Sequence, residues 1–148
     1  MVERRIEAAC RKAGRARGEV TLLAVTKVFS ADAILAAYDA GLREFGENYV
    51  QEFEAKYPVV NGLAEARFHL IGHLQSNKSR KAGEMFDVVQ TVDSAKLAGR
   101  WDELSKQLEV MIEVKLSPED SKHGCLPHEL AGVVAAVGLA NISDSPDS

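Results

Sequence analysis

The sequence predicts an α/β fold built on a parallel sheet. Short apolar runs rich in Val, Leu and Ile alternate along the chain with segments whose apolar residues recur every three to four positions. The carboxyl ends of these runs recur at intervals of roughly 20 to 25 residues, as expected for consecutive βα units. This pattern is typical of an open doubly wound sheet or of a (β/α)8 barrel, and composition alone does not choose between the two.

Six short apolar segments, bounded by polar or turn-forming residues, have the character of strands. In chain order they are TLLAVT (21–26), REFGE (43–47), RFHLIG (67–72), DVVQTV (87–92), EVMIEV (109–114) and GLANIS (138–143). Segments with helical spacing and Gly or Pro near their ends fill the intervals. These expected helices are ADAILAAYDAG (31–41), NYVQEFEAKY (48–57), LQSNKSRKAG (74–83), SAKLAGRWDELSKQ (94–107) and PHELAGVVAAVG (127–138).

Composition and charge exclude several classes of function. Residues 1–148 have the length of one domain, and 46% hydrophobic with 27% charged residues is the balance of a globular protein. A net charge of −4 gives no basic field for nucleic acid or an anionic membrane, and we interpret the cluster of Lys78, Arg80 and Lys81 as a solvated helix face. No G-x-G-x-x-G or G-x-x-x-x-G-K-[ST] sequence follows a strand, which removes the usual signatures of dinucleotide and P-loop binding.

Cysteine usage and hydropathy favour a cytoplasmic protein. Cys10 and Cys125 lie too far apart in the sequence to suggest a metal motif or a disulfide framework, so reduced thiols are expected. The longest apolar stretch, residues 133–140, is too short to span a bilayer. His69 and His73 would lie about 13 Å apart on one strand face, too far to share an ion, so no metal site is expected.

Lys27 is the first candidate for chemistry because it directly follows the first strand. Parallel α/β folds build their sites at the carboxyl ends of strands, and Leu23 and Val25 share the face of this lysine. Apolar surroundings disfavour the ammonium form, and a neutral amine can attack an aldehyde. Such surroundings would form a dry pocket at the rim of the sheet, but the spacing alone does not decide in favour of this interpretation. The alternative is a strand-end lysine that extends its amine into water.

The residues around Lys27 resemble those of a known family. KAGR (12–15) and AVTKVFSADAI (24–34) are similar to the lysine-bearing first strand of the pyridoxal phosphate homeostasis proteins. The resemblance covers about residues 5 to 135 and continues in order through GLREFGENYVQEFEAKYP, RFHLIGHLQSNKSRKA, VVQTVDSAKLA and VMIEVKLSPEDSKHGCLPHEL. That family is described as barrel proteins related to the alanine racemase N-terminal domain. The resemblance implies a (β/α)8 barrel of the TIM type, incomplete here, with about five or six βα units.

The resemblance also implies a site for pyridoxal 5′-phosphate (PLP). Lys27 would hold the cofactor as a Schiff base, Asn48 would lie beside it, and the backbone near Gly72 would approach its ring. Asn48 is equally suited to cap the helix expected near Tyr49, and the two roles are compatible. Lys122, in the loop after the fifth strand, is either a residue at the mouth of the site or an ordinary surface lysine.

The chain departs from the family pattern at two points. Phe29 stands where the family often has a second lysine, and the residues after Gly138 do not continue as the family's sixth strand and loop. In relatives the following region supplies the phosphate-binding loops, so we expect weak retention of PLP by this chain alone. A barrel without its last units also exposes strand edges, which favours self-association.

The function implied is that of a carrier in vitamin B6 homeostasis. A PLP enzyme needs a base and a substrate pocket besides the lysine, and Tyr38, Tyr49 and Tyr57 all lie in helical patterns. We therefore expect a non-catalytic PLP-binding protein, with apo PLP enzymes as candidate recipients. Two alternatives stay open: a small amino-acid enzyme of the alanine racemase type that works through the same Schiff base, and an inactive fragment without cofactor.

Overall fold

The computed structural model describes residues 1–101, 104 and 106–140. Five strands form one parallel sheet in the order β1-β2-β3-β4-β5. They are β1 (Leu23–Val25), β2 (Glu44–Glu47), β3 (Arg67–Leu70), β4 (Val88–Val92) and β5 (Glu109–Ile112). The spatial order of the strands equals their order in the chain, as in a barrel, whereas a doubly wound sheet reverses its order part-way. The structure therefore confirms a partial fold of the barrel type.

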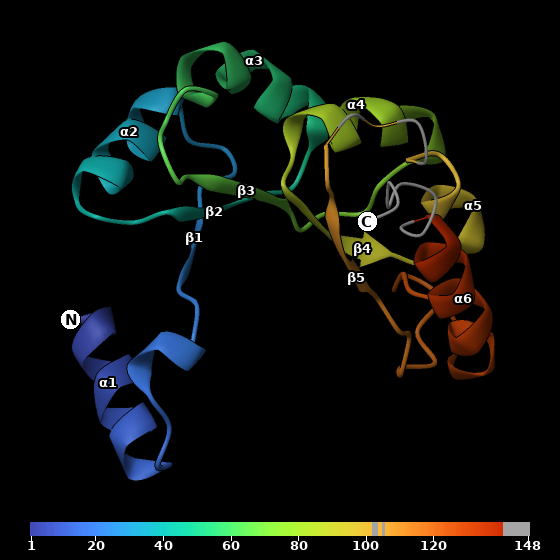
Figure 1. The fold of residues 1–148 in the computed structure, drawn as a ribbon, viewed down its shortest axis with the longest axis horizontal. Coiled ribbons are helices and arrows are strands. Elements are labelled where there is room, and N and C mark those ends of the chain that lie inside the picture. Colours follow the sequence, from blue (N-terminus) through green and yellow to red (C-terminus); the bar gives the residue numbers. More distant parts are fainter. Residues whose placement is uncertain (102–103, 105, 141–148) are drawn as a thin grey trace, which may run out of the picture.

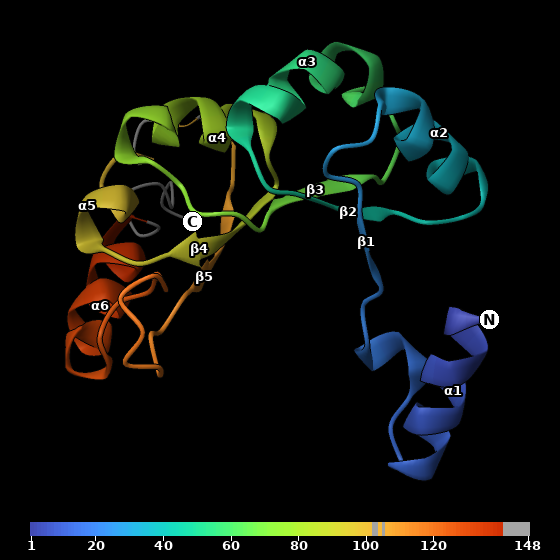
Figure 2. The ribbon, with the colours of Figure 1, turned by 180° about the vertical axis from the view of Figure 1, so that it is seen from behind.

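Helices alternate with the strands along the chain and lie beside the sheet in space. They are α1 (Val2–Lys12), α2 (Ala31–Asp39), α3 (Val50–Val60), α4 (Ser79–Met85), α5 (Ala95–Ala98) and α6 (Leu130–Ala140), with 3₁₀ turns η1 (Arg17–Glu19), η2 (Ser76–Lys78) and η3 (Pro127–Glu129). Figures 1 and 2, drawn from opposite sides, show α2, α3 and α4 along one side of the sheet, while α1 stands apart from it. Among the described residues, no helix has the length and apolar character needed to cross a bilayer.

The expected elements hold in the middle of the chain and differ near its ends. The first five expected strands are confirmed, but the sixth, at 138–143, is wrong where it can be compared, because residues 138–140 continue α6. Residues 141–143 lie outside the described part. A short apolar run does not distinguish a strand from a packed helix by periodicity. The helix expected at 94–107 begins as the four-residue α5 and ends before Gly99, and α1 was not predicted.

The core lies between the sheet and the helices α2, α3 and α4. Ala24, Phe45 and Phe68 are register partners across β1, β2 and β3, so their side chains share one face of the sheet. Phe53 of α3 packs on this face, with its ring centroid 4.9 Å from that of Phe68. This contact holds α3 over the strands whose carboxyl ends carry the candidate site.

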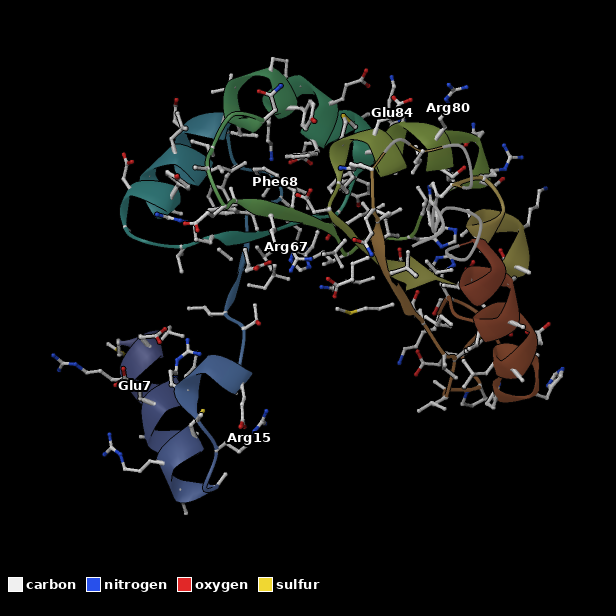
Figure 3. The ribbon with its side chains drawn as sticks, in the orientation of Figure 1. Glu7, Arg15, Arg67, Phe68, Arg80 and Glu84 are labelled. Carbon is white, nitrogen blue, oxygen red and sulfur yellow. The ribbon has the colours of Figure 1, made fainter. Side chains whose placement is uncertain are left out.

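The opposite face of the sheet is more open. Val25 and Met111, on its two edge strands, are 47% and 44% exposed. Figure 3 shows Arg67 on this side of β3 and Phe68 on the helix side. The Arg67 guanidinium lies 3.7 Å from the Glu44 carboxylate and 2.6 Å from that of Glu109, and its hydrogen bond to Glu109 raises the pKa of Arg67. In the described part of the chain, this face carries charge pairs and half-exposed apolar residues.

Phe53 should be a main determinant of stability. Its side chain is fully buried, and its ring also packs 4.6 Å from Phe86. Phe53→Ala should lower the free energy of unfolding by about 3–5 kcal/mol, because it removes apolar contact and leaves a cavity. Urea denaturation followed by circular dichroism measures the change. Tyr49→Ala, one turn earlier and 59% exposed, is the control and should cost less than about 0.5 kcal/mol; similar losses in both variants would contradict the assignment.

Candidate functional site

The three residues predicted to bind cofactor follow the carboxyl ends of neighbouring strands. Parallel pairing aligns these ends, because the Thr26 amide donates to the Gly46 carbonyl at 2.9 Å and the Ile71 amide to the Glu47 carbonyl at 2.9 Å. Lys27 follows Thr26, Asn48 follows Glu47 and Gly72 follows Ile71. The three residues lie one or two positions beyond the ends of β1, β2 and β3. The fold thus brings all three to the same end of the sheet, where the strands have their carboxyl ends.

Lys27 lies in the turn between β1 and α2. The Phe29 amide donates to the Thr26 carbonyl at 3.2 Å and closes this turn around it. The expectation of a dry pocket is wrong here, because Lys27 is exposed. The half-exposed Val25 gives the physical reason: this side of β1 has no covering layer among the described residues. Within that part of the chain, the Lys27 amine has no hydrogen bond or ion pair and is free to react.

Asn48 connects β2 to α3 and is half-buried. The capping role considered for it is wrong, because α3 begins at Val50 with Tyr49 as its N-cap and has no side-chain capping hydrogen bond. The Asn48 side chain makes no hydrogen bond to any described residue. Its amide is therefore available to a ligand, next to the strand end that carries Lys27.

Gly72 sits where two strand ends approach closely. A Cβ on Gly72 would lie 2.0 Å from the carbonyl oxygen of Asn48, well inside any allowed contact. The Gly72 carbonyl in turn accepts a hydrogen bond from the Thr91 hydroxyl of β4 at 2.8 Å. Backbone packing between the ends of β2 and β3 therefore requires glycine here, whatever ligand the site holds.

A cluster of polar and charged residues that the sequence did not reveal includes Thr26, the residue before Lys27. We call Thr26, Glu47, Glu52 and Lys56 the strand-end cluster. The Lys56 ammonium lies 3.0 Å from each Glu47 oxygen, 2.9 Å from Glu52 Oε1 and 3.1 Å from the Thr26 carbonyl. The Lys56 side chain is 8% exposed and that of Glu47 0%. The i,i+4 spacing of Glu52 and Lys56 was the one signal in the sequence that could have indicated this cluster.

Glu52 is the most accessible charged member of the strand-end cluster, with 27% of its side chain exposed. The hydrogen bond from Lys56 lowers its pKa, the backbone amide of Val28 adds to this effect by donating to Glu52 Oε1, and partial burial acts in the opposite direction. Glu52 is thus held as a carboxylate that connects α3 to the turn carrying Lys27.

His69 and His73, the two histidines weighed as a metal pair, have separate environments. His69 is buried in β3, where its ring contacts the Glu44 carboxylate and, at 3.0 Å, the Gln90 amide. His73 lies beyond the strand end and stacks on His123 with ring centroids 3.7 Å apart. In the described part of the chain, no group of three or more His, Cys, Asp or Glu side chains is placed to hold a metal ion.

Residues 2–143 match the family model of the alanine racemase N-terminal domain. The chain belongs to the alanine racemase N-terminal domain family. Within this family it is similar to curated pyridoxal phosphate homeostasis proteins, with 43% identity to those of Haemophilus influenzae and Escherichia coli K12 over 88% and 92% of this chain. The matched regions are 57% and 61% of those two relatives, so the chain spans about three fifths of their length.

Solved structures agree with this family assignment. PipY of Synechococcus elongatus with PLP bound is 40% identical, with a TM-score of 0.73 over 88% of this chain and 62% of PipY. The same protein without PLP gives a TM-score of 0.78, over 91% of this chain and 65% of PipY. An alanine racemase of Clostridium difficile, at 13% identity and a TM-score of 0.60, shows the shared fold alone.

Gly72 should be intolerant of any side chain in this family member. Gly72→Ala should lower the free energy of unfolding by about 1–3 kcal/mol or more, because the added methyl group meets a backbone oxygen that cannot move independently. Chemical denaturation measures the loss. The matched control is Gly62→Ala, where a Cβ would meet nothing within 4 Å. A Gly72→Ala protein as stable as this control would show that the strand ends are not packed as described.

The buried ion pair gives a second prediction. Lys56→Met should lower the free energy of unfolding by about 3–5 kcal/mol, because it leaves the Glu47 carboxylate buried without its partner. Adding Glu47→Gln removes that unpaired charge, so the double variant should regain a large part of the loss. A double-mutant cycle measures this coupling. Strictly additive losses would mean that Glu47 and Lys56 do not interact in solution.

Proposed function

We propose that this chain binds PLP through a Schiff base on Lys27 and takes part in vitamin B6 homeostasis as a non-catalytic carrier. The observation that carries the proposal is that the Lys27 amine and the Asn48 amide, which follow neighbouring strands, make no hydrogen bond to any described residue. The 40–46% identity to proteins named for pyridoxal phosphate homeostasis supports it, as does PipY, whose structure holds PLP.

The chemistry of Lys27 fits an aldehyde ligand. PLP supplies an aldehyde carbon, and condensation with a lysine amine forms a carbon–nitrogen double bond while the carbonyl oxygen leaves as water. An amine locked in an ion pair would be unavailable, but the Lys27 amine has no such partner among the described residues. Its exposure leaves the amine fully hydrated, so we expect the linkage to be reversible and weaker than one in a buried site.

The non-catalytic part of the proposal rests on the tyrosines. The Tyr38 hydroxyl donates to the Ala64 carbonyl at 2.9 Å, and the Arg43 guanidinium lies 4.0 Å from the centre of its ring. Tyr57 packs its ring edge-on against Phe53. Tyr38 and Tyr57 therefore have structural contacts on α2 and α3, which favours a binding protein over an enzyme that would use either of them as a base, whereas Tyr49 is 59% exposed.

The remaining features of the proposal concern location and partners. We propose a cytoplasmic protein of one domain that passes PLP to apo enzymes. β1 and β5 are the edges of the described sheet, and an unpaired strand edge can pair with another chain. We therefore also propose that this chain self-associates when it is produced alone.

Covalent capture tests the proposed function. Residues 1–148 are mixed with PLP, reduced with borohydride and digested, and each lysine is quantified by mass spectrometry. Lys27 should carry several-fold more adduct than Lys122, an exposed lysine that lies 3.5 Å from Glu119. Lys27→Arg should remove this excess and leave the labelling of Lys122 unchanged. Equal labelling of the two lysines in the unmodified chain would overturn the proposal.

A further inference from the structure

We propose that Glu52 is a positioning residue for Lys27. It acts through the backbone amide of Val28, the residue that follows Lys27 in the chain. The inference rests on the proposed function and names a residue of the same site that the sequence did not indicate. Its basis is that hydrogen bonds to Glu47, Glu52 and Lys56 hold both chain neighbours of Lys27. These neighbours are Thr26 and Val28, and the Lys27 side chain makes no such bond among the described residues.

The residue before Lys27 is fixed from two directions. The Thr26 hydroxyl donates to Glu47 Oε1 at 2.7 Å, and the Thr26 carbonyl accepts from the Lys56 ammonium at 3.1 Å. Thr26 is 6% exposed and Glu47 is fully buried. Buried charge-assisted hydrogen bonds are strong and directional. The peptide that enters Lys27 therefore has one orientation.

The residue after Lys27 is fixed by Glu52 alone among the charged side chains of the cluster. The Val28 amide donates to Glu52 Oε1, and the same oxygen lies 2.9 Å from the Lys56 ammonium. Val28 has a φ of 62°, in the left-handed region that β-branched residues strongly disfavour. A backbone in this state persists only where the surroundings hold it. Two contacts hold it here: the Glu52 carboxylate, and the turn hydrogen bond from the Phe29 amide to the Thr26 carbonyl.

The two restraints together determine where the Lys27 amine can reach. They fix the peptide planes on both sides of its Cα, and so the direction in which its side chain leaves the backbone, while the side chain itself stays exposed. Without Glu52, only the turn hydrogen bond between Phe29 and Thr26 would restrain Val28, so the peptide that follows Lys27 would be freer to turn. The amine would then start from a less defined direction, and its reaction with an aldehyde held at this end of the sheet would slow.

Glu52 can be removed without dismantling the cluster. Lys56 keeps both oxygens of Glu47 at 3.0 Å and the Thr26 carbonyl, and Glu52 itself is partly exposed on the surface of α3. The variant Glu52→Ala should therefore fold. Glu52→Gln keeps an oxygen that can accept the Val28 amide. Glu54→Ala removes a neighbouring carboxylate of α3 that pairs with the exposed Lys81, and it is the matched control.

The experiment measures the ratio of Lys27 to Lys122 adduct after PLP addition and borohydride reduction, together with the thermal midpoint of each variant. Glu52→Ala should lower the ratio at least about threefold, whereas Glu52→Gln and Glu54→Ala should keep it within about twofold of the unmodified chain. A purely structural role of Glu52 would move the thermal midpoint and leave the ratio of the folded protein unchanged, which would overturn the inference.

The outcome also separates this inference from the proposed function. If the unmodified chain labels Lys27 no more than Lys122, the proposed function fails, and the inference fails with it. If the unmodified chain labels Lys27 selectively and Glu52→Ala does so equally well, only the positioning role of Glu52 is overturned.

Discussion

The buried ion pair between Glu47 and Lys56 is the interaction on which the rest of the site depends. Removing two charges from water is costly unless every polar contact is replaced. Here the Lys56 ammonium has acceptors from β2, from α3 and from the residue after β1. The pair therefore does more than join two side chains, because it links two strand ends to the helix that follows the second. The turn that carries Lys27 is held by hydrogen bonds to Lys56 and Glu52.

Much of the fold was accessible from the sequence because the signals were local and repeated. Each of the five strands is a short apolar run followed by a helical pattern, and residues with these patterns form the sheet. The choice of Lys27, Asn48 and Gly72 came from the family resemblance, and the same regularity explains why the fold brings these three residues together. Once parallel strands are aligned, Lys27, Asn48 and Gly72 must meet at one end of the sheet, since each lies just after a strand.

The environment of each site residue could not be predicted, because it depends on contacts between distant segments. The exposure of Lys27 reflects what covers β1, and the need for Gly72 reflects the approach of the Asn48 carbonyl. Lys56 looks like a surface residue in its helical pattern, yet its ammonium lies against a carboxylate nine positions earlier in the chain. Apolar periodicity also predicted a strand at 138–143, whereas residues 138–140 continue α6, a helix that packs against α5 and β5.

The strand order has a consequence for how the chain acquires its structure. Leu23 pairs with Glu44, Glu44 with Arg67 and Val88 with Glu109, so each pairing in the sheet closes a loop of similar, modest length. The chain entropy lost on closing a loop grows only slowly with loop length, so no pairing in the sheet costs much more than another. Every unit can dock on the one made just before it, so the sheet can grow in step with synthesis on the ribosome, from the amino end onward.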